Sequence, residues 1–320
     1  MDAVYRPRRL RMHRKSSGKR LCPSARDVEI FRLLDRYRYL RSSFLCAFFP
    51  DADQTGLIKR LGDLFHEGYL DRPEQQYQYA NALYLPAVYE LNKRSASVLR
   101  EAGRHHAPAL LERGREGAHR HFAHALMIAD ILASIELGTR ASGLRFISAA
   151  EIISKGPCRN LENPFRVRTP VSFEGHAPVD VAVVPDGLFG LEYQSEAGKS
   201  YRFFALEADR NTMPIRRSRL MQSSYVRKLL AYGEVLTQGI YRSHFGIPNL
   251  LVLTVTVSDT HRTNIMAVLE EITGGKGSPV FLFKTMSTLG DGLKAPLPTP
   301  HMLIEPWQRQ GYPPFNIGEV

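Results

Sequence analysis

Two short acidic segments, about twenty residues apart, constrain the fold more than any other feature of this chain. The first is Val183-Val184-Pro185-Asp186-Gly187, in which an acid sits on a turn after an apolar stretch. The second is Phe203-Phe204-Ala205-Leu206-Glu207-Ala208-Asp209-Arg210, an apolar stretch that ends in two acids. Side chains at positions i and i+2 of a strand share a face, so Glu207 and Asp209 are expected to point the same way. If the two segments pair, Asp186 joins them and three carboxylates surround one point.

Three converging carboxylates provide the oxygen ligands that Mg²⁺ or Mn²⁺ prefers, and such an ion can activate water beside a phosphate. Asp186, Glu207 and Asp209 are therefore candidate metal ligands and catalytic residues. The alternatives are that Asp186 is an ordinary Asp-Gly turn residue and that Asp209 pairs with Arg210 or Arg216. Glu207 is the strongest candidate, because a carboxylate at the end of an apolar strand needs a partner.

The order of these features resembles the PD-(D/E)XK nuclease superfamily, in which an acid follows proline and a Glu-x-Lys motif lies on the next strand. The lysine position of that motif is Asp209 here, and Arg210 lies on the opposite face. Lys228, on the following predicted helix, could replace the strand lysine in stabilising charge on an attacked phosphate. The alternative is a phosphate-contacting or solvated lysine. Glu151 could supply a fourth acid, although a solvated helix-end residue is the simpler interpretation.

Basic residues gather in two parts of the chain. The net charge is +11, and eight Lys or Arg residues but only one acid lie in residues 1–20. Such a block cannot collapse on its own, so we expect a disordered arm that binds nucleic-acid backbones by releasing counterions. A solubility tail is the alternative. The second group falls on a helix predicted over 216–238. The predicted DNA-contacting residues of the two groups are Arg6, Arg8, Arg9 and Arg11, then Arg216, Arg217 and Arg219.

The hydrophobic pattern of residues 21–103 predicts a winged helix-turn-helix. Apolar residues recur at helical spacing, and Ser24 with Asp27 can cap the first helix. The third helix would lie in a DNA groove, with Gln54, Thr55, Lys59 and Arg60 facing outward. A winged helix used only for protein contacts is the alternative, because this segment carries eleven basic and eleven acidic residues. The predicted helices cover 24–40, 42–49, 54–67 and 92–103, and the predicted strands cover 69–72 and 87–91.

A second domain is predicted over residues 118–290, after a linker at 104–117. One helix, several strands, a helix and a strand follow one another, which is the order of a PD-(D/E)XK core. The Pro-rich tail, residues 291–320, has no periodicity, and we expect it to lie over the surface with Trp307 as an anchor. The predicted helices cover 118–137, 216–238 and 263–272, and the predicted strands cover 144–147, 167–173, 179–184, 188–193, 201–207, 250–257 and 280–284.

Several sequence blocks occur in an order that resembles the bacterial replication-relaxation family. They are "DVEIFRLLDRYRYL", "RLGDLFHEGYLDRP", "VYELNKRSASVLRE", "HFAHALMIAD" and "VPDG" followed by "FFALEADRNT". Members of that family are associated with plasmids and other mobile elements. The resemblance covers residues 24–240 and implies DNA binding with a role in plasmid replication or relaxation. It does not imply a particular chemical step.

The sequence thus predicts an α+β protein with an N-terminal winged helix-turn-helix and a PD-(D/E)XK-like α/β domain with a mixed sheet. Three cysteines without metal-ligand spacing favour a reducing, cytoplasmic compartment, and no apolar run approaches the ~20 residues that span a bilayer. DNA is the expected partner, and a homodimer stays open. Two alternatives remain: a transcriptional or copy-number regulator with an inactive nuclease-like domain, and an adaptor that recruits replication or transfer proteins.

Overall fold

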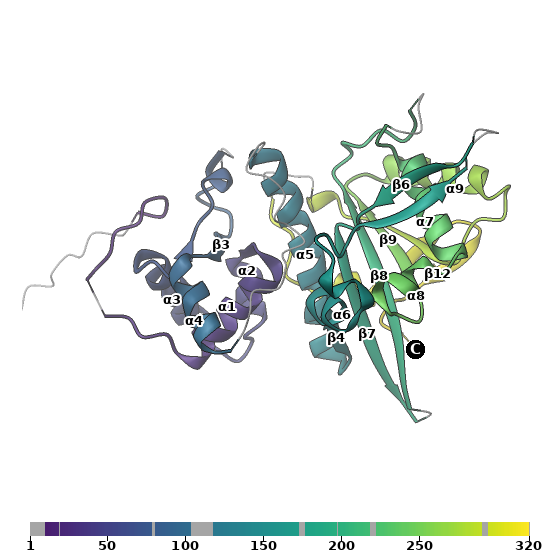
Figure 1. Ribbon diagram of the computed structural model, residues 1–320. Helices are drawn as coiled ribbons and strands as arrows, with labels where there is room; N and C mark the ends of the chain where they lie inside the picture. The colour runs from purple at the N-terminus through teal and green to yellow at the C-terminus, as the bar shows by residue number, and fades with distance from the viewer. Residues whose placement is uncertain are drawn as a thin grey trace, which may run out of the picture. The chain divides into compact units, whose positions relative to one another are not determined.

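The chain divides into two compact units (Figure 1). The computed structural model describes residues 10–18, 20–78, 81–103, 118–172, 177–196, 198–217, 222–289 and 294–319. Unit 1 comprises residues 1–130 and 292–298, and unit 2 comprises residues 131–291 and 299–320. The division falls inside helix α5 (Ala118–Ser142). The predicted linker at 104–117 lies outside the described residues.

The described residues of unit 1 form four α-helices and one 3₁₀ helix before α5, and a small antiparallel sheet with the strand order β1-β3-β2. Each predicted helix and strand is present within a few residues of its expected ends, and β1 adds a third strand. The elements are α1 (Ala25–Tyr37), β1 (Leu40–Arg41), α2 (Ser42–Ala47), α3 (Gln54–His66), β2 (Leu70–Asp71), the 3₁₀ helix η1 (Glu74–Gln78), β3 (Val88–Leu91) and α4 (Lys93–Glu101).

Local sequence explains where the main helices of unit 1 begin. Ser24 caps α1 by accepting a hydrogen bond from the Asp27 backbone N–H, and the Asp27 carboxylate accepts one from the Ser24 backbone N–H, as predicted. Asp53 caps α3 through the backbone N–H groups of Thr55 and Gly56. Ile30 on α1 and Leu61 on α3 have no exposed surface, so the apolar faces of these helices form the core.

The described part of the N-terminal segment is held against unit 1, which corrects the predicted disordered arm for residues 10–18. The Arg14 guanidinium donates to the backbone carbonyls of Phe65 at 2.8 Å and Leu70 at 2.9 Å. The Ser17 backbone N–H donates to the buried Glu67 carboxylate at 2.8 Å. These contacts satisfy carbonyl groups near the end of α3, a role that composition alone does not indicate.

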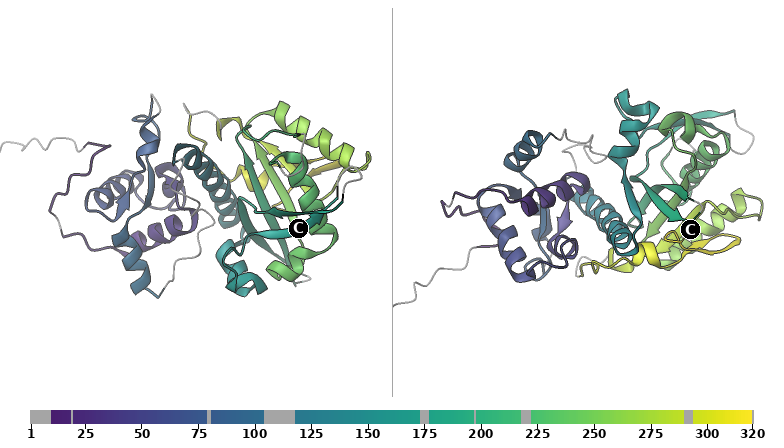
Figure 2. Two further views of the ribbon diagram at one scale, coloured as in Figure 1. Left: turned by 45° about the horizontal axis from the view of Figure 1, so that its top comes forward. Right: turned by 90° about the horizontal axis from the view of Figure 1, so that it is seen from below.

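Unit 2 is built on a seven-stranded mixed sheet with the order β12-β11-β10-β9-β8-β7-β4, beside a two-stranded ribbon of β5 and β6 (Figure 2). Strand β7 runs antiparallel to both of its neighbours, β4 and β8, whereas β9 runs parallel to both β8 and β10. The strands are β4 (Arg145–Ser148), β5 (Val167–Val171), β6 (Val179–Val183), β7 (Gly187–Ser195), β8 (Gly198–Asp209), β9 (Leu251–Thr256), β10 (Phe281–Thr285), β11 (Trp307–Arg309) and β12 (Tyr312–Phe315).

Helices connect these strands and cover both faces of the sheet. A Cβ atom at Gly187 would lie 3.2 Å from the Leu206 Cβ atom and 3.4 Å from Leu132 of α5, so glycine permits close packing of the α5 face. Glu207 points to the opposite face, where α7 and α9 contact each other. The remaining helices of the unit are α6 (Ala149–Lys155), η2 (Pro157–Asn160), α7 (Tyr225–Thr237), α8 (Ile240–Phe245), α9 (Asp259–Ile272), η3 (Ser287–Leu289) and α10 (His301–Ile304).

Helix α5 is long and apolar enough over Phe122–Ser142 to cross a membrane. This corrects the expectation that no apolar run reaches that length. However, 78% of the apolar window is buried inside the structure, as in the core helix of a soluble protein. The finding is therefore weak evidence for a membrane span.

The C-terminal tail is part of the fold, which corrects the prediction that it lies over the surface. Strand β11 pairs antiparallel with β10, and β12 pairs with β11 at the edge of the sheet. Trp307 is fully buried, and its indole N–H donates to the Met302 carbonyl at 3.0 Å. The sequence did not reveal these strands because they are only three and four residues long, and β12 contains two prolines.

We expect Trp307→Ala to lower the free energy of unfolding by about 3–5 kcal/mol, because it removes a fully buried aromatic side chain. Urea unfolding followed by circular dichroism measures this change. Tyr312→Ala, which alters a half-exposed aromatic residue on the neighbouring strand, should cost far less. Equal small effects at both positions would contradict the buried role of Trp307.

Candidate functional site

The pairing of β7 with β8 brings Asp186 next to Glu207, as the sequence predicted. Gly187 pairs with Leu206 at the end of the ladder. The Asp186 backbone N–H donates to the Leu206 carbonyl at 2.9 Å, and the Asp186 carboxylate accepts from the Ala208 backbone N–H at 3.0 Å. The turn acid is therefore held at the carboxyl end of β8, with Glu207 and Asp209 on the same strand.

Glu207 is almost fully buried and has two partners on α7. Its side chain is 2% exposed, and one carboxylate oxygen contacts the Lys228 ammonium. The other oxygen accepts a hydrogen bond from the Tyr232 hydroxyl at 2.6 Å. Lys228 and Tyr232 are four residues apart and thus share one face of α7, which lies over the end of β8. Lys228 was predicted to reach the acids from the following helix, and in the structure it contacts Glu207 from α7.

The three groups Asp186, Glu207 and Lys228 influence one another electrostatically. Burial raises the pKa of Glu207 to about 7, against the opposing effect of the Lys228 ammonium, and the nearby Asp186 adds to the increase. Burial lowers the pKa of Lys228, but the negative charges of Glu207 and Asp186 outweigh this and raise it above its ordinary value. Lys228 therefore keeps its positive charge at neutral pH, while Glu207 titrates close to neutrality.

Asp209 has a different set of partners from Glu207. Its carboxylate, 4% exposed, contacts the His261 Nε2 atom of α9 at 2.6 Å and accepts from the Thr212 backbone N–H at 3.1 Å. The Tyr225 ring lies edge-on to the His261 ring at 5.8 Å. Burial raises the pKa of the Tyr225 hydroxyl well above its ordinary value, and the negative charge of Asp209 raises it further.

Protein groups contact the carboxylate oxygens at which a metal ion was predicted to bind. Both carboxylate oxygens of Glu207 and both of Asp209 already have protein partners. Within the ranges that the structure describes, no group of three His, Cys, Asp or Glu side chains could hold a metal ion. A divalent cation would have to displace Lys228 from Glu207 before binding there. Coordination of Mg²⁺ or Mn²⁺ by Asp186, Glu207 and Asp209 stays a prediction.

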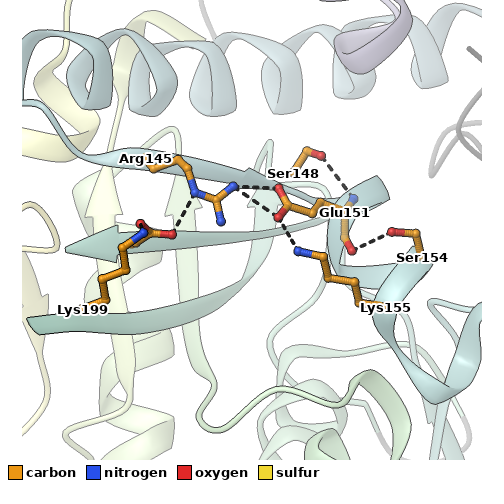
Figure 3. A network of polar contacts seen from close by, with 7 residues as sticks. Arg145, Ser148, Glu151, Ser154, Lys155 and Lys199 are labelled. Carbon is orange, nitrogen blue, oxygen red and sulfur yellow. Dashed lines mark hydrogen bonds and ion pairs between the residues drawn. The ribbon is translucent and has the colours of Figure 1, made fainter. Parts of the chain in front are cut away.

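Glu151, the potential fourth acid, belongs to a separate network on α6 and β4 (Figure 3). The Arg145 guanidinium donates to Glu151 at 3.0 Å and to Glu192 at 2.9 Å, and Lys155 contacts Glu151 at 2.8 Å. These cations lower the pKa of the Glu151 carboxyl despite its partial burial. Glu151 is thus an ion-paired residue at the start of a helix and not a member of the acid site.

The predicted basic cluster does not form one helical face. Helix α7 begins at Tyr225, so Arg216 and Arg217 lie in the extended segment before it. The helix was predicted too early because the segment has no proline or glycine between Arg216 and Lys228 to mark its start. Arg216 is paired with Glu271 of α9 at the surface. Arg219 lies outside the described residues.

The predicted DNA-facing residues of unit 1 divide into two groups. Thr55 and Lys59 are exposed on α3, as expected. The Gln54 side-chain amide instead donates to the Phe49 and Ala52 carbonyls, both at 3.0 Å, and so holds the turn before α3. These bonds leave Gln54 occupied within its own turn.

Arg60 is also engaged inside unit 1, which corrects its prediction as an outward-facing residue. Its guanidinium donates to the Asp27 carboxylate at 2.6 Å and to the Cys22 carbonyl at 3.1 Å. Asp27 is fully buried, so Arg60 compensates a buried charge and ties α3 to the start of α1.

Of the four arginines of the arm that were predicted to contact DNA, the structure describes Arg11. The Arg11 guanidinium donates to the backbone carbonyls of Leu83 and Leu85, so it is an anchor in this structure. Arg6, Arg8 and Arg9 lie outside the described residues. Contacts between these three arginines and the DNA backbone therefore stay predictions.

Sequence reasoning missed three aromatic or imidazole members of the site, namely Tyr225, Tyr232 and His261. The spacing of Tyr225, Lys228 and Tyr232 places all three on one face of a helix and could have indicated the two tyrosines. No comparable signal exists for His261, which reaches Asp209 from an element 52 residues further along the chain.

The fold defines a two-unit α+β protein with a helical N-terminal unit and a mixed-sheet unit carrying a buried acid–lysine site. Residues 31–250 match the replication-relaxation family. Because this match covers more than half of the chain, the protein belongs to the replication-relaxation family. Comparisons with curated proteins and with solved structures give no match.

We expect Lys228→Met to lower the free energy of unfolding by about 3 kcal/mol, because it leaves the buried Glu207 carboxylate without its cation. The double variant Glu207→Gln, Lys228→Met should cost clearly less than the sum of the two single changes. Urea unfolding of the four proteins gives the coupling energy. The exposed pair Arg216 and Glu271 provides a matched control, for which about 0–1 kcal/mol is expected. An equally small coupling at Glu207 and Lys228 would contradict the buried pair.

Proposed function

We propose that this protein binds DNA and acts in the replication or relaxation of a plasmid or other mobile element. In this proposal unit 1 is a winged helix-turn-helix that holds duplex DNA, and unit 2 is a PD-(D/E)XK-like domain that acts on a DNA strand or its phosphates. Membership of the replication-relaxation family supports the overall role. The single observation that carries the proposal is the convergence of Asp186, Glu207 and Lys228 at the end of β8.

The order of elements in unit 1 supports DNA binding. Helix α2, a short turn and helix α3 are followed by antiparallel strands and a closing helix, which is the order of a winged helix-turn-helix. Lys59 and Thr55 are exposed on α3 and are suited to contact phosphates. Asp27 and Arg60 fix α3 against α1, so the position of these contact residues is set by a buried ion pair.

The connectivity of unit 2 supports the nuclease-like domain. Strand β7 is antiparallel to β4 and β8, and β9 is parallel to β8. Helix α5, strands β4, β7 and β8, helix α7 and strand β9 occur in this order along the chain, with α6, η2, β5 and β6 inserted after β4 and α8 inserted after α7. This is the helix–three strands–helix–strand order expected for a PD-(D/E)XK core. Asp186 precedes the second of these strands and Glu207 lies on the third, where the superfamily pattern requires the two acids.

A second candidate function is a DNA-binding regulator whose nuclease-like domain is not catalytic. The occupied oxygens of Glu207 and Asp209 favour it, because a cleaving site needs carboxylates that can accept a cation. The same chain could then control copy number or recruit other replication proteins. The two candidates differ in whether Asp186 and Glu207 are needed for chemistry or only for stability.

Binding to duplex DNA should weaken steeply with salt, with a log–log slope of about 0.9 for each phosphate contact. Lys59→Ala and removal of residues 1–9 should each make the slope shallower, because they remove predicted backbone contacts. Fluorescence anisotropy across a salt series measures this. Lys93→Ala, at an exposed lysine of α4, is the matched control and should leave the slope unchanged. Equal slopes for all four proteins would contradict the predicted DNA contacts.

Isothermal titration with Mn²⁺ separates the two candidate functions. If unit 2 is a metal-dependent nuclease, Mn²⁺ should bind the wild-type protein by displacing Lys228 from Glu207, and Glu207→Gln should abolish that binding. If the protein is a regulator, little Mn²⁺ should bind, and supercoiled plasmid incubated with the protein and Mn²⁺ should stay intact.

Nicking that disappears in both Glu207→Gln and Asp186→Asn, with DNA affinity retained, would instead establish a nuclease. Nicking that persists in both variants would point to a contaminant. Circular dichroism of each variant checks that the fold is kept.

A further inference from the structure

A pocket of about 480 Å³ lies in unit 2, outside the acid site. Three segments that are distant in the sequence form it: residues 257–262, residues 283–287, and residues 306–308. Its polar lining residues include Ser258, Asp259, Arg262, Lys284, Thr285 and Ser287. All of them belong to unit 2, so the pocket is internal to one compact unit.

The pocket lies where two parallel strands end. Strand β9 ends at Thr256 and β10 ends at Thr285, and they run parallel with these residues paired in register. Ligands of α/β proteins commonly bind at the carboxyl ends of parallel strands. The acid site occupies the same edge, because Asp209 at the end of β8 pairs in register with Thr256.

A hydrogen bond links the pocket to the acid site. Asn211, two residues after Asp209, donates from its side chain to the Ser258 hydroxyl at 3.0 Å. Ser258 in turn accepts from the His261 backbone N–H at 3.2 Å, and His261 contacts Asp209. The first turn of α9 therefore contributes residues to both places.

Some hydrogen-bond donors of the lining have no partner in the described part of the chain. Arg262 has a side chain that is 25% exposed, and its Nε atom is buried without a hydrogen-bond partner in the described part of the chain. The Thr285 hydroxyl is buried and likewise lacks a partner among the described residues. Buried polar atoms without partners are costly, so a ligand that reaches these groups gains hydrogen bonds that the described protein does not use.

We propose that this pocket binds a phosphate group, with Arg262 as the main cation and the hydroxyls of Ser258, Thr285 and Ser287 as further donors. An arginine beside several hydroxyls provides the charged and neutral hydrogen bonds that phosphate oxygens accept. This proposal deepens the proposed function, because a DNA strand that reaches the acid site carries further phosphates along the same edge. A phosphate at a strand end or on a free nucleotide has the same chemistry.

The acidic neighbours of the pocket do not prevent anion binding. Asp259 contacts Arg262 at 3.1 Å, but its side chain is 74% exposed, so the pair is weak and easily exchanged. Glu305 lies 3.5 Å from Lys284 and is 57% exposed. Lys284 is held by the His301 and Glu305 carbonyls, both at 3.0 Å, and so contributes positive charge to the lining without needing to contact the ligand.

The test is calorimetric titration of the full-length protein with inorganic phosphate at constant ionic strength and without metal. We expect saturable binding by the wild-type protein and a loss of about tenfold or more in affinity in Arg262→Ala, because a charge-assisted hydrogen bond is removed. Thr285→Val removes only the unpartnered hydroxyl and should weaken binding without loss of stability. Lys276→Ala is the charge-matched control, at an exposed lysine beyond the end of α9, and should bind as the wild type does.

Three probes identify the source of the phosphate. A nucleoside monophosphate, an oligonucleotide with a 5′-phosphate and the same oligonucleotide with a 5′-hydroxyl are compared in wild type and Thr285→Val. Preference for the 5′-phosphate end assigns the pocket to a strand end, and equal binding of both oligonucleotides assigns it to backbone phosphates. Tightest binding of the monophosphate assigns it to a free nucleotide.

The absence of phosphate binding by the wild-type protein, or equal affinity in the wild type and both pocket variants, would overturn the proposal. These outcomes are distinguishable from failure of the proposed function, because the phosphate titration requires neither DNA cleavage nor DNA binding by unit 1. If the protein binds duplex DNA but not phosphate, only the pocket proposal is wrong. If the protein binds phosphate through Arg262 but neither binds nor cuts DNA, only the proposed DNA function is wrong.

Discussion

The burial of the Glu207 carboxylate at the end of β8 is the constraint on which the acid site depends. A charge in that position requires a cation and a hydrogen-bond donor, and Lys228 and Tyr232 supply them from one face of α7. Helix α7 is therefore fixed over the sheet by polar contacts as well as by its apolar residues. A cation that binds directly to the Glu207 carboxylate must compete with these contacts.

Pairing between β7 and β8 explains why the two acidic segments meet. A hairpin of such long strands has one register in which the apolar residues of both stay buried, and it places Gly187 opposite Leu206. The Asp186 side chain then reaches the Ala208 backbone N–H, so a turn residue becomes part of the site. In the same register, Gly187 lies where α5 packs against the sheet. Because glycine has no Cβ atom, the helix can approach the strand closely at this point.

The sequence predicted what depends on local pattern and missed what depends on contacts between distant segments. Helical spacing and capping residues were enough for α1 and α3, and the acidic segments were enough for the meeting of Asp186 and Glu207. The pairing of Arg60 with Asp27 was missed. The helical pattern predicts which side of α3 faces outward, but it does not show that an arginine on that helix pairs with a buried acid 33 residues away. Strand β11 was missed because three residues show no period, although Trp307 on this strand is one of the largest fully buried side chains among the described residues.

The parallel strands β8, β9 and β10 end at one edge, and this common edge explains why the polar chemistry of unit 2 collects there. Backbone groups within the sheet are satisfied by neighbouring strands, whereas the segments that leave it must turn and can carry polar side chains. Asn211, two residues after the end of β8, has a positive φ of 58°, a conformation that asparagine tolerates, and its side chain donates to Ser258 after β9. This contact couples the turn after the acid strand to the turn that begins α9. The acid site and the neighbouring pocket are therefore built on two turns that share a hydrogen bond.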